Sequence, residues 1–463
     1  MNSIRVLHIT AHLGGGVGRA LSELTRYRIS TGSRVKDTFV CLEPPETTRY
    51  ADVIVDAGAE LHIAPSAATL DSLLAHADIV QLEWWHHPLL AGWMNRLQAV
   101  PMRTIVWSHI SGLHYPAIPP AFVGMPHAFV CTSDVSREHL KPAQDPPQNI
   151  VQAVSSTGGF DDLPLPKRDL RSVPRFAYLG SLNPAKLHPE VTDYLNAVDI
   201  PNFSVNFFGD ASANPQLRRE SEKAGDSARF VLRGYTEKPS AVFGEADVLV
   251  YLLNPTHYGT TENALIEAMA CGVVPVVLDN PVEKSIVRDG ETGIVVNSPQ
   301  SFADAISFLY RNPSERLRMS AAASLVAREL YSVRKSAGQL DAICAQIIEQ
   351  PKRPCDFESV FGKTPSDWFL SCIGQYAHLF QDNMEHSARA ERLQYQFLYE
   401  ATKSSAFHFA SYFPSDTRLA HWTAMLESDL ASQRLAPSPE IDIVLASPAP
   451  FSPATSIHRN HRV

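Results

Sequence analysis

The sequence predicts an α/β protein with two tandem domains, each built on a parallel sheet, followed by a helical extension. Two series of short, strand-like apolar runs alternate with helical or loop segments, which is the pattern of parallel sheets with crossover helices. A passage rich in turn-forming residues, 154–166, separates the two series and indicates a hinge. The chain of 463 residues is also too long for a single hydrophobic core.

The first series begins close to the N-terminus. Its predicted strands are 4–10, 37–42, 78–82, 103–107 and 128–131. Between the first two strands, 11–18 is rich in glycine and predicts a loop, and 19–29 predicts an amphipathic helix with Leu21, Leu24 and Tyr27 on one side. We expect this series to form a first domain at 1–165.

The second series predicts a domain of similar size at 166–349. Its predicted strands are 175–179, 205–208, 229–232, 248–252, 274–278 and 293–296, and two helices, 301–311 and 313–331, follow the last of them. No further strand series appears after residue 350, and 368–403 predicts helix, so we expect a helical extension at 350–434. The segment 435–463 is dense in Pro and Ser and is expected to be a disordered tail.

Composition excludes several classes of function. The net charge of −9 and the pI near 6.1 argue against a nucleic-acid partner. Six cysteines without a C-x-x-C motif indicate neither a disulfide framework nor a zinc site, and suggest a reducing, cytoplasmic compartment. No stretch approaches eighteen apolar residues, so no membrane span is predicted, and we interpret 4–10 as a first strand instead of a signal peptide.

The most informative stretch is 258–272, in which two threonines precede a helical segment that ends at Gly272 before a β-branched run. The start of such a helix offers unpaired backbone N–H groups to an anion. Glu262 and Glu267 lie five positions apart, so they point about 140° away from each other. We therefore interpret them as separate groups and not as a paired acid and base.

Two further loops follow predicted first strands. The glycines of 14–18 could approach a phosphate or sugar, but Arg19 breaks the dinucleotide pattern and no Gly-Lys-Ser/Thr follows; a simple strand-to-helix turn is an equal alternative. Lys186 ends the loop after the first strand of the second domain, where open α/β sheets bind ligands. Its ammonium could neutralise a diphosphate leaving group.

Aromatic and histidine side chains follow strands of the first domain. His109 and the run 83–87 could bind and stack on a sugar, whereas His86 and His87 are better explained as a structural aromatic cluster. His8 and His12 lie in a strand and a loop, which makes a zinc pair improbable. The sequence contains no Asp-x-Asp motif, so no metal is expected.

Together these residues resemble the retaining glycosyltransferases of the GT-B fold, the glycogen-synthase-like class (glycosyltransferase family 4-like). The resemblance spans 4–349 by the order of its motifs. The most specific motifs are 263–277 and 286–296, and weaker ones are 14–18, 158–161 and 180–186. The resemblance implies two Rossmann-like domains facing a cleft, with the acceptor on the side of the first domain and a nucleotide sugar held mainly by the second.

The resemblance also implies roles for particular residues. Glu267 matches the second glutamate of the family's E-x-x-x-x-x-x-x-E pattern and should bind ribose, Lys186 should bind the diphosphate, and His109 should lie near the transferred sugar. Two positions depart from the family: Gly259 replaces the first glutamate and Ser181 replaces an arginine. Glu262 and Arg233 are the candidates to supply the missing charges. The expected site comprises catalytic His109, Lys186 and Glu262, with donor contacts from Gly15, Gly16, Ser181, Lys186, Arg233, Thr260, Thr261, Asn263, Ala264 and Glu267.

Two hypotheses follow. The first is a metal-independent, retaining hexosyl-type transferase that moves a sugar from a nucleoside diphosphate sugar to the hydroxyl of a glycan or lipid-linked acceptor, in bacterial glycan, polysaccharide or glycolipid assembly. The second is a catalytically silent protein that binds nucleotide or glycan or supports a partner; a sugar-nucleotide epimerase is disfavoured because no acid/base set converges. Positive charge in and after the first helix could contact anionic lipid, with a solvated helix face as the alternative; the residues are Arg19, Arg26, Arg28, Arg34 and Lys36.

Overall fold

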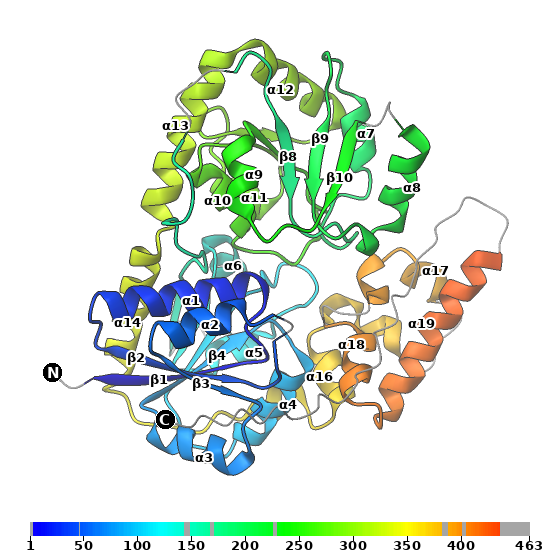
Figure 1. Cartoon of the computed structure of the whole chain (residues 1–463). Coiled ribbons are helices and arrows are strands. Elements are labelled where there is room, and N and C mark those ends of the chain that lie inside the picture. The colour runs from blue at the N-terminus through cyan, green and yellow to red at the C-terminus, as the bar shows by residue number, and fades with distance from the viewer. Residues whose placement is uncertain are drawn as a thin grey trace, which may run out of the picture.

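The computed structural model describes residues 3–45, 47–142, 149–166, 171–225, 229–381, 388–400 and 404–435 (Figure 1). The first domain contains a parallel sheet in the order β3-β2-β1-β4-β5-β6-β7. Its strands are β1 (Ile4–Thr10), β2 (Val35–Cys41), β3 (Glu60–Ile63), β4 (Ile79–Trp84), β5 (Thr104–Ser108), β6 (Ala128–Cys131) and β7 (Ile150–Ala153). The strand order reverses between β1 and β4.

Helices cover both faces of this sheet. They are α1 (Gly15–Ser30), α2 (Arg49–Asp56), α3 (Ala67–His76), α4 (Pro88–Leu97), α5 (Pro120–Gly124) and α6 (Asp134–His139). A later helix, α14 (Val333–Ile347), returns from the second domain and packs against α1 (Figure 1). Its apolar residues, including Leu340, Ile343 and Ile347, belong to the same buried cluster as Leu21 and Leu24. The chain therefore crosses between the domains twice.

The second domain contains a parallel sheet in the order β10-β9-β8-β11-β12-β13. Its strands are β8 (Phe176–Leu179), β9 (Val205–Phe208), β10 (Phe230–Gly234), β11 (Val248–Tyr251), β12 (Val274–Leu278) and β13 (Ile294–Val296). Its helices are α7 (Val191–Asn196), η1 (Ala211–Ala213), α8 (Pro215–Ala224), α9 (Pro239–Glu245), α10 (Asn263–Ala270), α11 (Pro281–Ile286), α12 (Pro299–Arg311) and α13 (Pro313–Leu330). The order reverses between β8 and β11.

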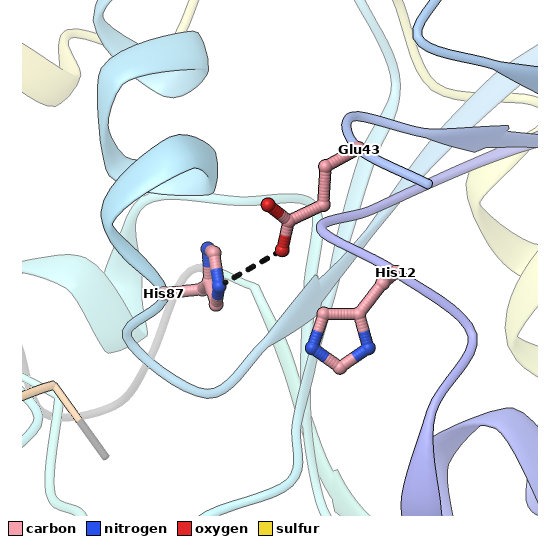
Figure 2. A group of neighbouring side chains, drawn as sticks. All are labelled: His12, Glu43 and His87. Carbon is pink, nitrogen blue, oxygen red and sulfur yellow. Dashed lines mark ion pairs between the residues drawn. The ribbon is translucent and has the colours of Figure 1, made fainter. Parts of the chain in front are cut away.

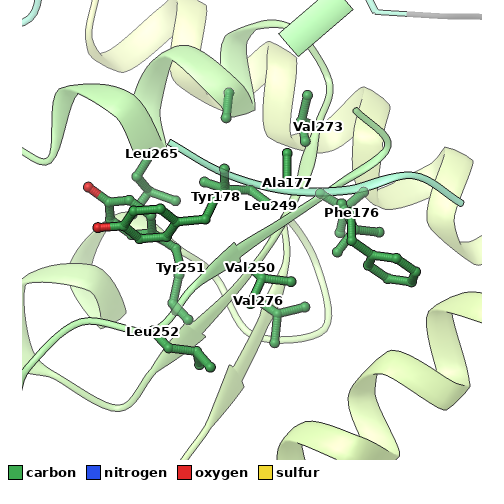
Figure 3. Close-up of a cluster of buried hydrophobic side chains, with 14 of the residues drawn as sticks. Phe176, Ala177, Tyr178, Leu249, Val250, Tyr251, Leu252, Leu265, Val273 and Val276 are labelled. Atoms are coloured by element: carbon green, nitrogen blue, oxygen red, sulfur yellow. The ribbon is translucent and has the colours of Figure 1, made fainter. Parts of the chain in front are cut away.

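The core of the second domain places two tyrosines at the reversal. Tyr178 on β8 and Tyr251 on β11 stack with ring centroids 5.8 Å apart, and Figure 3 shows their hydroxyls lying side by side at one edge of the apolar cluster. Both rings are buried, so each hydroxyl needs a partner. Tyr178 donates to the carbonyl of Ser181, and Tyr251 donates to a carboxylate oxygen of Glu262.

All strands expected from the sequence are present, and two further strands were missed. Both missed strands, β3 and β7, lie at the edges of the first sheet and have no fully buried residue. Edge strands of this kind lack the continuous apolar run that marks a buried strand. The predicted loop at 11–18 was wrong in part, because α1 begins at Gly15 and the glycines form its first turn.

The extension is helical, as expected, and in the described part of 368–403 the helical region is divided into several short helices. Its elements are α15 (Phe357–Phe361), α16 (Pro365–Ser371), η3 (Gly374–Phe380), α17 (Arg389–Arg392), η5 (Gln396–Tyr399), α18 (Ala406–Tyr412) and α19 (Thr417–Leu435). Their apolar side chains share one buried cluster with those of the first domain. Most of the tail expected at 435–463 lies outside the described residues.

Two connections between the domains run next to each other. The first follows β7, and the second joins α13 to α14. The hydroxyl of Thr157 in the first connection donates to the carbonyl of Tyr331 in the second, at 2.6 Å. Ser336 at the start of α14 similarly donates to the carbonyl of Ser155. The segment 154–166 contains no helix or strand, as a hinge requires.

Candidate active site

The candidate donor residues lie where the strand order of the second sheet reverses. Lys186 follows β8, and the segment 257–262 follows the adjacent strand β11. In open parallel sheets, the loops at the carboxyl ends of two such strands form the crevice that binds ligands. The fold therefore brings Lys186 and Glu262, 76 residues apart in sequence, to one point.

Lys186 and Glu262 form a buried ion pair. The ammonium lies 2.5 Å from Oε1 and 2.7 Å from Oε2, and the Tyr251 hydroxyl donates to Oε2 at 2.7 Å. Burial opposes the ionisation of Glu262, but Lys186 and His257 outweigh it and lower the pKa of the carboxyl. Burial likewise opposes the charge on Lys186, but Glu262 raises its pKa. Both groups are therefore charged at neutral pH.

Gly259 is the residue that makes room for this pair. A Cβ at position 259 would overlap Oε1 of Glu262 and would lie 2.5 Å from Nζ of Lys186. Glu262 itself has φ +47°, in the left-handed region that favours glycine. The backbone of Glu262 is thus strained in a way that aims its carboxylate at the space left by the missing side chain at 259.

Two more side chains surround the pair. His257 accepts the backbone N–H of Gly259 at Nδ1 and places Nε2 2.9 Å from Oε1 of Glu283. His257, Glu262 and Glu283 are buried together and could in principle hold a cation. However, Nδ1 of His257 is occupied and Lys186 already neutralises Glu262, so these donors fit an ammonium better than a metal ion.

Two helix N-termini meet beside Lys186. The first residue of α10, Asn263, approaches the first turn of α1 so closely that a Cβ on Gly16 would lie 2.8 Å from its Nδ2. Neither α1 nor α10 has a side-chain cap, so their first backbone N–H groups are open to an anion. Gly15 has φ +55° and faces open space, so no side chain covers this turn. The backbone N–H groups of the two helix starts suit a diphosphate, whereas the unpartnered Oδ1 of Asn263 is an acceptor and suits a hydroxyl or N–H donor.

Glu267 lies one turn deeper in α10 and pairs with the other domain. Its Oε1 is 3.0 Å from a guanidinium nitrogen of Arg19 on α1. Burial raises the pKa of Glu267 to about 7, against the opposing effect of Arg19 and Arg49. The residue expected to bind ribose is therefore engaged in an ion pair between the domains.

Hydroxyl groups form another part of the interface between the domains. Thr260 Oγ1 lies 3.0 Å from the hydroxyls of Thr132, Ser133 and Ser136, which follow β6. Thr261 donates to the carbonyl of Thr132. Both threonines expected at the donor site are buried at this interface, while Ala264, the next small residue of α10, is half-buried.

His109 follows β5 and is held by a buried carboxylate. Its Nε2 lies 2.8 Å from Oε2 of Glu83, while its Nδ1 is buried without a hydrogen-bond partner. Burial disfavours the ionised form of Glu83, but hydrogen bonds from His109 and His8 outweigh it and lower its pKa to about 2. Glu83 is also hydrogen-bonded to His8, and the other ring nitrogen of His8 is hydrogen-bonded to Asp37. Asp37 in turn forms an ion pair with Arg28. Glu83 thus fixes the orientation of the His109 ring, and a proton on Nε2 leaves Nδ1 of the neutral ring as an acceptor.

The two positions that depart from the family are not compensated in the same way. Glu262 fills the space at 259, as described above. Ser181 is exposed and contributes its carbonyl to Tyr178. Arg233 lies in the edge strand β10, which β9 separates from β8, and it donates to Asn206, so the structure does not bring it to Lys186.

Several site residues escaped the sequence reasoning. Arg19, Tyr251, His257 and Glu283 line the pairs described above but belong to no motif that identified them. Only their position in the fold could have identified some of them, because Tyr251 and His257 flank the carboxyl end of β11, next to the point where the strand order reverses. The expected basic helix surface was wrong in part, because Arg19 pairs with Glu267 and Arg28 is buried between Asp37 and Asp341.

Comparison with known proteins agrees with this geometry. Residues 170–326 match the family model for glycosyl transferases group 1. A glycosyltransferase from Rickettsia africae ESF-5 aligns with a TM-score of 0.58 at 15% identity, covering 76% of this chain and all of that one. The protein has the GT-B fold. The second GT-B domain carries the family match, and it also carries Lys186 and Glu262.

Two other GT-B structures were solved with ligands. Anabaena HepE in complex with UDP and glucose aligns with a TM-score of 0.59 at 12% identity, over 74% of this chain and 100% of that one. The pneumococcal O-GlcNAc transferase GtfA, in complex with UDP and GlcNAc, aligns with a TM-score of 0.54 at 12% identity, over 76% of this chain and 100% of that one. No curated protein matches the sequence. Among the described helices of this GT-B protein, none is both long and apolar enough to cross a membrane.

Proposed function

We propose that this protein is a retaining, metal-independent glycosyltransferase that moves a hexose-type sugar from a nucleoside diphosphate sugar to a hydroxyl acceptor. The observation that carries the proposal is the convergence of Lys186 with the uncapped starts of α1 and α10. One ammonium and two sets of backbone N–H groups suit the charge that develops on a diphosphate leaving group. The second domain's match to glycosyl transferases group 1 supports the same chemistry.

The remaining residues fit complementary roles. Nδ1 of His109, an acceptor without a partner, suits a sugar hydroxyl, and Glu267 suits the ribose once Arg19 releases it. The proposal needs no titrating acid and base pair, because an oxygen of the leaving phosphate can take the proton of the acceptor. Glycan or lipid-linked acceptors in bacterial glycan assembly both supply the required hydroxyl.

One observation favours the catalytically silent alternative. Both charged groups expected to bind the donor are already paired inside the protein, Lys186 with Glu262 and Glu267 with Arg19. Donor binding must therefore replace at least one internal pair. A protein that only binds nucleotide would show binding without turnover.

A panel of UDP-, GDP- and ADP-sugars separates the two functions. Release of the nucleoside diphosphate should occur with one donor class and should fall at least a hundredfold in Lys186→Met. A thermal shift with the free nucleotide reports binding independently of turnover. Nucleotide binding with no release from any donor would favour the silent protein, and equal release by Lys186→Met would refute the proposed site.

A further inference from the structure

The first sheet has its own reversal point, between β1 and β4, and it is lined by side chains that the donor site does not use. His12 follows β1, Glu43 follows β2, and Trp85 and His87 follow β4. Figure 2 shows His12, Glu43 and His87 converging from three different loops. By the same topological argument as for the second sheet, this edge is where a ligand of the first domain binds.

Helix α18 of the C-terminal extension closes this group of side chains. The hydroxyl of Tyr412 donates to Oε2 of Glu43 at 2.7 Å. The ring of His408 packs edge-on against His87, with centroids 4.9 Å apart. Ser404, just before α18, donates to the carbonyl of Trp85. We call His12, Glu43, Trp85, His87, His408 and Tyr412 the α18 cluster.

The α18 cluster combines an aromatic face with a hydroxyl acceptor. Trp85 is only partly buried, and its ring lies 5.6 Å from His12 and 6.3 Å from His109. An indole face packs against the C–H face of a sugar ring, and a carboxylate such as Glu43 accepts bonds from sugar hydroxyls. This combination is suited to carbohydrate.

Charge decides which carbohydrate fits. Within the described residues, the α18 cluster contains a carboxylate but neither lysine nor arginine, the side chains that usually recognise phosphate or carboxylate groups. A phosphorylated sugar or a uronic acid would place its anion near Glu43 without a fixed cation. These six side chains therefore fit an uncharged sugar residue better than an anionic one.

Hydrogen bonding disfavours a metal ion in the same place. His12, Glu43 and His87 are close enough to hold one. However, Nδ1 of His12 accepts the N–H of Gly14, and Nδ1 of His87 accepts the N–H of Leu89. Each neutral ring then carries its proton on Nε2, which can donate to a carboxylate or a sugar oxygen but cannot ligate a metal.

The α18 cluster adjoins the donor site. Trp85 contacts the ring of His109, and His12 is bonded to Gly14, the residue that precedes α1. A sugar bound on Trp85 would thus lie beside the group proposed to contact the transferred sugar. We infer that α18 of the extension completes a subsite for an uncharged sugar of the acceptor. The assignment of this sugar to the acceptor rests on the proposed function, whereas the sugar subsite itself does not.

The experiment uses the full chain and an array of neutral disaccharides, their phosphorylated forms and their uronic acid forms. The wild-type protein should bind neutral sugars. Tyr412→Phe should weaken that binding about fivefold to tenfold by removing one bond to Glu43. Trp85→Ala should weaken it about tenfold or more. Ser411→Ala is the matched control, because this residue is exposed on the same helix, and it should bind as the wild type does.

Specific results would overturn the inference. They are a preference for anionic sugars, unchanged sugar binding by both Tyr412→Phe and Trp85→Ala, or a zinc-induced thermal shift that His12→Ala removes. UDP-induced thermal shifts are measured on the same variants and should be unchanged. A wild-type chain without nucleotide binding or donor turnover would refute the proposed function, whereas neutral-sugar binding that depends on Tyr412 would still support the subsite.

Discussion

The carboxylate of Glu262 occupies the space that a side chain at position 259 would fill. A Cβ on Gly259 would overlap Oε1 of Glu262 and crowd Lys186. The left-handed backbone at Glu262, with φ +47°, is what directs the carboxylate there. A carboxylate from position 262, on a strained backbone, therefore stands beside Lys186 where position 259 itself carries no side chain.

Exchanging the two residues tests this replacement. In Gly259→Glu/Glu262→Gly, a carboxylate again faces Lys186, and a glycine relieves the positive φ, which is worth about 1 kcal/mol. We expect the double variant to retain turnover within about tenfold of the wild type, while Glu262→Gly alone loses a hundredfold or more. Gly259→Ala should also be impaired, because its methyl group displaces the carboxylate. Donor turnover is the measurement, and an inactive double variant that still folds would contradict the replacement.

The Lys186–Glu262 pair should show strong coupling in stability. Lys186→Met leaves a buried carboxylate without its cation and should lower the free energy of unfolding by about 3–5 kcal/mol. Lys186→Met/Glu262→Gln should recover most of that loss in urea unfolding, yet remain without turnover. Lys284→Met, which breaks an exposed pair with Asp279, is the control and should change stability by less than about 1 kcal/mol. Additive effects of the two buried substitutions would refute the coupling.

Glu267 should make stability depend on pH. Its pKa is raised to about 7 in the folded protein from the ordinary 4.5. The stabilisation from this group is therefore complete below pH 4.5 and is lost as the pH rises through 7. Glu267→Gln removes the titration, so its stability relative to the wild type should improve by about 2–3 kcal/mol between pH 5 and pH 8.

Urea midpoints at the two pH values measure this effect of Glu267. Glu245→Gln, at an exposed carboxylate of the second domain, serves as the control and should show no such trend. A difference between Glu267→Gln and the wild type that is identical at both pH values would show that Glu267 is ionised throughout.

Glu83 should act as a positioning residue for His109. Glu83→Gln removes the charge between His8 and His109 and should destabilise the first domain by about 3 kcal/mol. If Glu83 fixes the tautomer of His109, kcat should fall by about tenfold or more, while the nucleotide-induced thermal shift remains unchanged. The pH profile of kcat should also change, which a purely structural role would not produce. An unchanged profile with full kcat would contradict the assignment.

The sequence predicted the architecture well because buried parallel strands leave continuous apolar runs. It failed at β3 and β7, which are partly exposed edge strands. It predicted helix at 368–403 but did not show that this region is divided into short helices whose apolar residues pack on the first domain. Motif spacing identified Lys186, Glu262 and Glu267 as candidates. It could not reveal that Arg19 pairs with Glu267, because contacts across the cleft depend on how two domains lie together. Arg233 was chosen by closeness in sequence, and β9 separates it from the site.

The two adjacent connections between the domains, bonded by Thr157 and Tyr331, also determine how the site can open. A single linker would let the second domain swing in any direction. Two adjacent linkers that are hydrogen-bonded to each other restrict this motion. They favour rotation of the domains about a single hinge axis at the edge of the interface. Opening by this rotation would separate Arg19 from Glu267 and Thr260 from Ser133 in one movement. It would leave Lys186 and Glu262 together, because both belong to the second domain. The same movement withdraws the start of α1 from Lys186 and α10, so the proposed diphosphate site is complete only when the two domains are closed on each other.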